Sequence, residues 1–172
     1  SFLLLVGRGS LQSQTEGLVE SIGLRQRVRF LGVRRDVPEL MSAADGYVLS
    51  SAWEGMPVVL LEAGASGIPI VATAVGGNRE VVREGDTGFV VPPRDPAALA
   101  GAMLRLAELP EEQRRRLGER GREHVENRYA LPRIIDLWEE MYRDLLARKD
   151  VPVTSNGRNQ GDAATGRAGG HR

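Results

Sequence analysis

Cysteine is absent from this 172-residue chain, and histidine occurs only twice, at His124 and His171. The lack of cysteine excludes a disulfide framework, a thiolate metal site and a thiol nucleophile. Two histidines so far apart in sequence do not form a multi-histidine metal site. The chain also has no Asp-x-Asp pair that could hold a divalent ion against a diphosphate. We therefore expect no metal and no resident cofactor.

An excess of charge of one sign is also missing, because 23 Lys and Arg residues balance 23 Asp and Glu residues. No global basic field would draw the protein to nucleic acid or to an anionic membrane. The apolar runs are far shorter than the ~20 residues of a membrane-spanning helix, and Phe2–Val6 resembles a buried strand more than a signal peptide. We expect no membrane span and a cytoplasmic location, with the inner membrane face as an alternative for a full-length parent.

The body of the chain alternates strand and helix signals. Short apolar runs predict strands at Phe2–Val6, Val28–Leu31, Gly46–Leu49, Pro69–Ala72 and Phe89–Val91. Phe2–Val6 has the pattern of a strand covered on both faces. Helical spacing, caps and prolines predict helices at 11–22, 36–44, 57–65, 79–82, 97–106, 111–127 and 132–147. Repeated βα units with short strands predict an α/β fold, a doubly wound (Rossmann-like) parallel sheet with helices on both faces.

The domain organisation follows from a change in composition. Residues 1–149 carry the alternating pattern and form one expected domain. Residues 150–172 are rich in Gly and small polar side chains, which bury too little apolar surface to offset the entropy of ordering. We expect a disordered tail there.

The segment 50–73 contains the most informative residues. The helix expected from Pro57 is apolar around nearly its whole circumference, so we expect it to be buried with Glu62 inside it. Glu54 precedes that helix, on a loop at the carboxyl end of a strand, where open α/β sheets bind ligands. The free N–H groups near Pro57–Val59 could hold a phosphate. A purely structural alternative pairs Glu62 with an arginine of a neighbouring helix and leaves Glu54 to stabilise the helix end.

The spacing Glu54-x7-Glu62 resembles the E-x7-E signature of retaining family-4 glycosyltransferases with the GT-B fold. The flanking segments are similar to that family's nucleotide-sugar domain as well: Ala43–Asp45, Gly67–Thr73, Val75–Glu80, Gly85–Pro93 and Asp95–Leu99. The similarity extends from Phe2 to about Leu146. It implies the C-terminal half of a GT-B enzyme, which transfers a sugar from a nucleotide-diphosphate sugar, with retention, to an acceptor that the sequence does not identify.

The resemblance also implies roles for individual residues. Glu54 matches the glutamate that approaches the donor sugar and the reacting centre, and Glu62 matches the one that accepts hydrogen bonds from the ribose. Gly55, Met56 and Pro57 match the loop that lines the sugar pocket, although many relatives have Phe-Gly in place of Met56-Pro57. Further matches are the diphosphate-facing amides of Val58 and Val59, the glycine turn near the nucleotide at Gly7 and Gly9, and the base contact at Val33.

The chain departs from the family at its N-terminus. The strand–loop–helix unit that carries an Arg and Lys clamp for the diphosphate precedes Phe2–Val6 in relatives, as does the acceptor-binding domain. We therefore expect a donor-binding fragment that is inactive alone. A phosphorylase would need a lysine for pyridoxal phosphate, and Lys149 at the end of the last helix is the only lysine. The alternatives are a sugar-nucleotide epimerase of the same fold and a non-catalytic binding module.

Overall fold

A computed structural model of the protein describes residues 1–148. These residues belong to two units, Ser1–Ile134 and a second that begins at Ile135. The expected tail, 150–172, lies outside the described residues. All of the strands lie in the first unit, which is described first.

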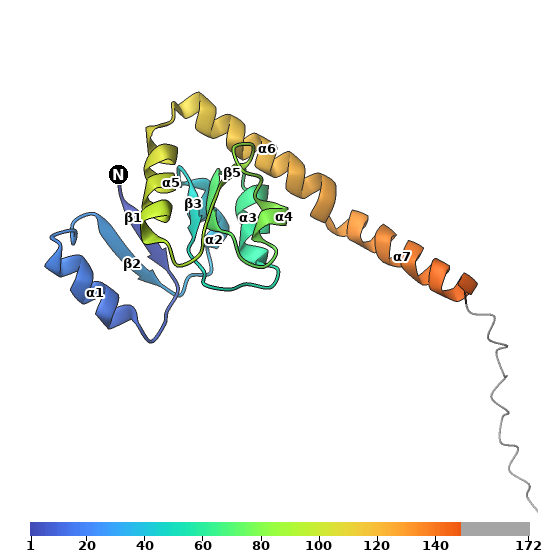
Figure 1. The fold of residues 1–172 in the computed structure, drawn as a ribbon, viewed down its shortest axis with the longest axis horizontal. Coiled ribbons are helices and arrows are strands. Elements are labelled where there is room, and N and C mark those ends of the chain that lie inside the picture. Colours follow the sequence, from blue (N-terminus) through green and yellow to red (C-terminus); the bar gives the residue numbers. More distant parts are fainter. Residues whose placement is uncertain (149–172) are drawn as a thin grey trace, which may run out of the picture. The chain divides into compact units, whose positions relative to one another are not determined.

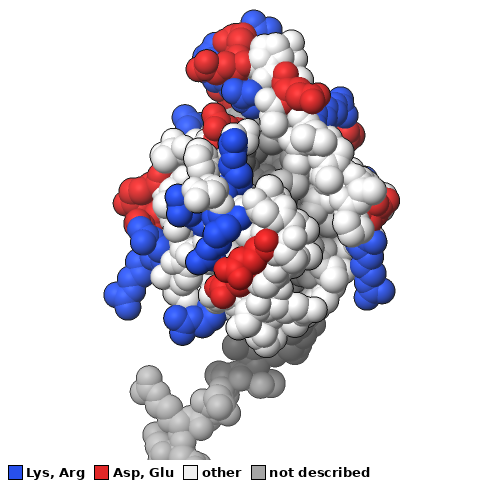
Figure 2. All heavy atoms as spheres, turned by 90° about the vertical axis from the view of Figure 1, so that its left-hand side faces the viewer, with Lys and Arg blue, Asp and Glu red and all other residues white. Residues whose placement is uncertain are grey.

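The first unit begins with a two-stranded parallel sheet. Strand β1 (Leu3–Val6) pairs with β2 (Val28–Gly32), and helix α1 (Gln12–Ser21) connects them. The expectation that β1 is covered on both faces is wrong, because Leu3, Leu4 and Val6 are 37%, 43% and 47% exposed. An apolar run shows that these residues favour burial, but they are buried only where other helices or strands pack on both faces of the strand. Figure 2 views the side of Figure 1 on which α1, β1 and β2 lie, and much of the surface there is uncharged, although basic and acidic side chains adjoin one another in places.

A second parallel sheet forms the core of the unit. Its order is β3 (Tyr47–Leu49), β4 (Ile70–Thr73), β5 (Gly88–Val91), and all four residues of β4 are buried. Ile70 and Ala72 pack on one face with Leu60 of helix α3 (Val58–Ala65). Val71 packs on the other face with residues of helix α5 (Pro96–Glu108). Helices therefore cover both faces, as expected (Figure 1).

The expectation of one continuous sheet is wrong. Strand β3 pairs with β4, and β1 pairs with β2, so the five strands divide into sheets of two and three. Within residues 1–148 no ladder joins the two sheets. Each sheet is parallel, and each therefore presents the carboxyl ends of its strands along one edge.

Helix boundaries follow local chemistry in most places. Asp95 accepts a hydrogen bond from the amide of Ala98 (2.9 Å), which confirms it as the N-cap of α5. Asp36 precedes α2 (Val37–Ser42), but its carboxylate binds the guanidinium of Arg34 instead of capping the helix. That ion pair lowers the pKa of the Asp36 carboxyl.

Helix α3 begins one residue later than expected, since Pro57 is its N-cap. It ends at Ser66-Gly67, where Gly67 has the expected left-handed conformation (φ 71°). The guanidinium of Arg122 donates to the carbonyls of Ala65 and Ser66, both at 3.0 Å, and so satisfies the C-terminus of α3.

Arg122 belongs to helix α6 (Glu111–Tyr129), which packs closely on α3. A Cβ at Gly118 would lie 1.9 Å from the carbonyl oxygen of Gly67, and one at Gly64 would lie 2.6 Å from Val125 Cγ2. Only glycine at both positions permits this approach. The short helix α4 (Asn78–Val81) also contacts α6.

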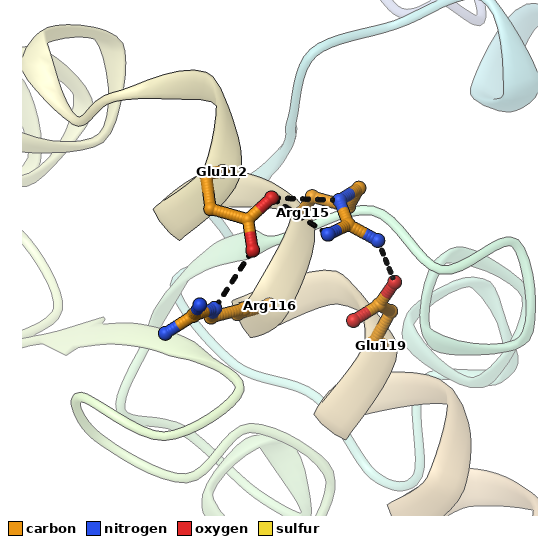
Figure 3. A network of polar contacts seen from close by, with 4 residues as sticks. All are labelled: Glu112, Arg115, Arg116 and Glu119. Atoms are coloured by element: carbon orange, nitrogen blue, oxygen red, sulfur yellow. Dashed lines mark hydrogen bonds and ion pairs between the residues drawn. The ribbon is translucent and has the colours of Figure 1, made fainter.

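The outer face of α6 carries a network of charges (Figure 3). Arg115 binds Glu112 and Glu119 at 2.6 and 2.7 Å, and Arg116 binds Glu112 at 2.9 Å. These pairs lower the pKa of Glu112 and raise that of Arg115. All four side chains are at least half exposed, so Arg115 and Arg116 belong to a solvated helix face, as expected. Arg114 does not, because it is half-buried and donates to the carbonyl of Leu109 at 2.6 Å.

Helix α7 (Leu131–Arg148) provides the described part of the second unit. The expected apolar face is present and solvent-exposed, with the rings of Trp138 and Tyr142 5.7 Å apart. Arg143 pairs with Glu139 one turn earlier. Among the helices of residues 1–148, none combines the length and the hydropathy that crossing a bilayer requires.

Candidate functional site

Glu54 lies on the loop that leaves the carboxyl end of β3, as expected. Its side chain is half-buried, and its Oε1 accepts a hydrogen bond from the hydroxyl of Ser51 at 2.6 Å. This short bond to a carboxylate restricts the rotamer of Glu54. The strand end and the Ser51 hydroxyl together hold one acid at the rim of the sheet.

A second loop, which follows β4, supports the first. Gly76 has φ +47°, and a Cβ there would lie 2.0 Å from the carbonyl oxygen of Glu54. The amide of Gly77 donates to the carbonyl of Gly55 at 2.7 Å. A Cβ on Gly77 would lie 3.2 Å from Met56 Sδ. Gly55 and Met56 are exposed above this contact, so the loop that the resemblance assigns to the sugar pocket faces solvent.

The N-terminus of α3 adjoins the Glu54 loop. Pro57 is buried as the N-cap, and the next two amides, of Val58 and Val59, belong to the first turn, whose N–H groups lack helical acceptors. Val58 is 62% exposed. This helix end can therefore present amide hydrogens to an anion.

Glu62 is exposed, and the expectation that α3 buries it is wrong. Leu60, Ala63 and Gly64 form the buried side of α3, whereas Val58, Glu62 and Ala65 share an exposed face at helical spacing. The helix is apolar all round in sequence, but it packs on only part of its circumference. Within residues 1–148 no ion pair joins Glu62 to an arginine, so the structural alternative lacks its partner.

A hollow of about 280 Å³ lies beside Glu62, between α2 and α3. Glu62 is its only charged lining residue, and the remaining walls are formed by Val37, Pro38, Met41, Ala65 and Ser66. The arrangement offers a carboxylate acceptor next to apolar surface. Such a combination suits a flat or apolar group that carries hydroxyls.

The pKa of Tyr47, at the start of β3, depends on both acids. Burial raises the pKa of its phenol, and the negative charges of Glu62 and then Glu54 raise it further. Because a carboxylate disfavours a nearby phenolate, the phenol is held neutral and remains a hydrogen-bond donor. Sequence reasoning did not single out Tyr47, and an isolated tyrosine in a short strand gives no signal for such a position.

Gly7, Gly9 and Val33 follow the strands of the other sheet. Gly7 has φ +120° at the end of β1, and its amide donates to the carbonyl of Gly32 at the end of β2 at 2.7 Å. Val33 follows β2 and is 72% exposed. Within residues 1–148 no hydrogen bond joins these three residues to the Glu54 loop or to Glu62. The structure thus brings 54–59 together on one loop and helix end, and it places Gly7, Gly9 and Val33 at the ends of β1 and β2.

Potential metal ligands do not cluster in the described part of the chain. Across residues 1–148 there is no group of three or more His, Asp or Glu side chains arranged to hold an ion. His124 is buried, and its Nε2–H donates to the carbonyl of Glu80 at 2.7 Å, so it serves packing.

Comparison with known proteins identifies the family of the chain. Residues 2–124 match the family described as glycosyl transferases group 1. The chain is 38% identical over 144 residues to N-acetyl-alpha-D-glucosaminyl L-malate synthase of Bacillus anthracis, covering 84% of this chain and 38% of that protein. It is 27% identical to UDP-Gal:alpha-D-GlcNAc-diphosphoundecaprenol alpha-1,3-galactosyltransferase of Escherichia coli, again covering 38% of the relative and 87% of this chain.

Solved structures show the same fold. The sucrose-phosphate synthase of Thermosynechococcus elongatus matches with a TM-score of 0.74 and 36% identity, over 86% of this chain and 39% of that one. Anabaena HepE, solved in complex with UDP-glucose, matches with a TM-score of 0.72 and 26% identity, over 85% and 41%. The α/β fold with parallel sheets is therefore that of GT-B glycosyltransferases, and the chain spans about two fifths of these relatives. The chain belongs to the group 1 glycosyl transferase family.

Proposed function

We propose that this chain is the donor-binding part of a retaining, metal-independent glycosyltransferase that uses a nucleotide-diphosphate sugar. One observation carries the proposal: Glu54 and Glu62 bracket the exposed N-terminal turn of α3 beside the carboxyl end of β3. A carboxylate, a helix N-terminus and a second carboxylate match, in that order, the sugar, the diphosphate and the ribose of such a donor.

The roles of the acids follow from their surroundings. Glu54 is oriented by Ser51 and can accept hydrogen bonds from sugar hydroxyls near the reacting carbon. Gly55, Met56 and Pro57 line the sugar side, and the amides of Val58 and Val59 face the diphosphate. The exposed position of Glu62 supports a ribose contact, since a carboxylate left in water is free to accept two adjacent hydroxyls. The hollow beside it would receive the nucleoside.

Gly7, Gly9 and Val33 remain proposals for the nucleotide side. The observed orders β2-β1 and β3-β4-β5 fit the doubly wound order 3-2-1-4-5-6 if one strand lies between the two sheets. We propose that this strand, with its helix, precedes β1 in a longer protein. It would join the sheets and bring the ends of β1 and β2 into one site with Glu54.

In this scheme the protein contributes position and electrostatics. The donor phosphates meet the amides of α3, and Glu54 holds the sugar so that its anomeric carbon faces the acceptor. An N-terminal acceptor domain in cis would close the site.

Binding to this chain tests the proposal directly. We expect UDP and UDP-glucose, the ligands of the HepE structures, to shift amide resonances of residues 54–62 in NMR titrations. Glu62→Gln should weaken both ligands about tenfold, because it removes a charged acceptor. Glu54→Ala should weaken UDP-glucose and leave UDP unchanged.

The control is Glu108→Gln, an exposed glutamate near the end of α5. It should leave both affinities unchanged. Because the nucleobase is unknown, ADP-glucose and GDP-mannose are tested in parallel. If Glu62→Gln binds every donor as tightly as the wild type, the ribose role is wrong.

A further inference from the structure

Four hydrogen bonds connect the loops after β3 and β4 into a closed circuit. Two lie on the site side: the Ser51 hydroxyl donates to Glu54 (2.6 Å), and the Gly77 amide donates to the Gly55 carbonyl (2.7 Å). Two lie beneath it, at the end of β4: the Thr73 hydroxyl donates to the Ser51 carbonyl (2.7 Å), and the Asn78 amide donates to the Thr73 carbonyl (2.8 Å). The chain itself closes the circuit between these bonds.

Thr73 is the member that both loops share. Its hydroxyl reaches the first loop, and its carbonyl receives the side chain that follows the second loop. Thr73 is 3% exposed and Asn78 is fully buried. The Asn78–Thr73 bond is buried and the Thr73–Ser51 bond is partly buried, and hydrogen bonds in such surroundings are costly to lose.

Asn78 shows that this position is chemically specific. Its Nδ2 meets a carbonyl, while its buried Oδ1 has no hydrogen-bond partner within the described residues. The reversed amide would place two oxygens against each other, so the donor orientation is determined. A buried acceptor without a partner destabilises the fold. The amide is thus tolerated for the one bond it makes to Thr73.

The circuit encloses a close contact between the two backbones. A Cβ at Gly76 would lie 2.0 Å from the Glu54 carbonyl oxygen, so the second loop lies directly against the peptide that follows Glu54. Small movements of the second loop must therefore move Glu54. Side chains that hold the second loop act on Glu54 without touching a ligand.

We propose that Thr73, Asn78 and Ser51 are positioning residues that fix the carboxylate and the following peptide of Glu54. Ser51 orients the carboxylate, and Thr73 and Asn78 hold the two loops together from below. The inference rests on the proposed function only for the identity of the group that Glu54 meets, the donor sugar. None of the three residues is assigned a direct contact with it.

A matched pair of threonines separates positioning from general stability. Thr87 is 1% exposed and its Oγ1 also makes one hydrogen bond, from the Arg83 amide at 2.9 Å. It precedes β5, whereas Thr73 ends β4, so in this parallel sheet the two lie at opposite strand ends. Thr73→Val and Thr87→Val each replace one buried hydroxyl with a methyl group and keep the shape of the side chain.

The first measurement needs no ligand. Amide hydrogen exchange of Gly77 is followed by NMR in both variants, and urea unfolding supplies the correction for global stability. Loss of one net hydrogen bond should speed Gly77 exchange about five- to tenfold in Thr73→Val. Thr87→Val should leave it unchanged. Equal exchange in the two variants, after correction, would overturn the proposal.

The second measurement compares the affinities of UDP-glucose and UDP. The ratio is the affinity for UDP-glucose divided by the affinity for UDP. Thr73→Val and Ser51→Ala should each lower this ratio about tenfold relative to the wild type. Ser51→Thr, which keeps the hydroxyl, should restore the wild-type ratio, and Thr87→Val should not change it. If Ser51→Thr fails to restore the ratio that Ser51→Ala lowers, the hydroxyl is not the orienting group and the proposal fails there.

One result separates this inference from the proposed function. Suppose that Gly77 exchanges faster in Thr73→Val, but that the ratio of UDP-glucose affinity to UDP affinity stays unchanged even in Glu54→Ala. The hydrogen-bond circuit would then be upheld. The same result would show that Glu54 does not face the sugar.

Discussion

The phenol of Tyr47 is the side chain on which the two candidate acids act together. Burial comes first among the causes that raise its pKa, and the charges of Glu62 and Glu54 follow. Seven residues separate the two acids in sequence, and both of their charges act on this one phenol. Tyr47 thus reports on the electrostatics of the site from a position that no motif contains.

Tyr47 should make the protein less stable at alkaline pH. Its folded pKa is raised, so the contribution to stability is complete below the unfolded value of about 10 and is lost as pH rises toward the folded value. We expect Tyr47→Phe to make the decline in unfolding free energy above about pH 10 shallower. Urea unfolding between pH 8 and 11 measures it.

Tyr129, whose pKa is also raised by burial, supplies a comparison. The double variant with Tyr129→Phe should flatten the decline further. A slope in Tyr47→Phe equal to that of the wild type would contradict the burial and charge effects at Tyr47.

At the scale of elements, the sequence was sufficient where the signal is local. Asp95-Pro96 marks the start of α5 and Ser66-Gly67 the end of α3, because caps and left-handed glycines act within a few residues. The positions of Glu54 and of the loop 55–57 could be predicted for the same reason. Resemblance to a family added their proposed roles.

What failed depends on contacts between elements. The run Phe2–Val6 favours burial, yet only neighbouring elements decide whether β1 is covered. Likewise, an apolar sequence around Glu62 does not reveal which side of α3 meets α6. The bond from Thr73 to Ser51 joins residues 22 positions apart, and Asn78 binds Thr73 from five positions further along the chain. These residue types alone give no signal of that pairing.

The contact between α3 and α6 can be tested by replacing glycine with alanine at two helical positions, where we expect opposite effects on stability. Gly118→Ala would place a Cβ 1.9 Å from the Gly67 carbonyl, so we expect a loss of about 1–3 kcal/mol as the helices move apart. Gly101→Ala, on the exposed side of α5, meets nothing within 4 Å. It should stabilise by about 0.5–1 kcal/mol.

Thermal and urea unfolding of both variants measure these differences. The α3–α6 packing described above would be contradicted if Gly118→Ala were as stable as Gly101→Ala. Both glycines lie inside helices, so helix propensity is matched in the comparison.

At the scale of the molecule, the proposed function assigns to this chain the donor side of a transferase site. The chain spans 38% of the Bacillus anthracis and Escherichia coli relatives. We expect this chain to bind nucleotide sugars weakly and to transfer no sugar. A protein extended to the length of those relatives should transfer with retention at the anomeric carbon and should be insensitive to EDTA.

Transfer assays with several donors, followed by NMR of the product anomer, measure this expectation. In the longer protein Glu54→Ala should greatly reduce transfer. Robust transfer by this chain alone would show that it is a complete enzyme, and an inverted product would refute the retaining mechanism.

The division into two sheets also has a practical consequence for handling the protein. Each sheet ends in strands with one unpaired row of amides and carbonyls, and such rows template pairing with other chains. The segment Phe2–Val6 is apolar, uncharged and free of proline, which is the composition of aggregation-prone stretches. Concentrated solutions should therefore associate edge to edge, and a single lysine in place of Leu4 should act as a gatekeeper that improves solubility.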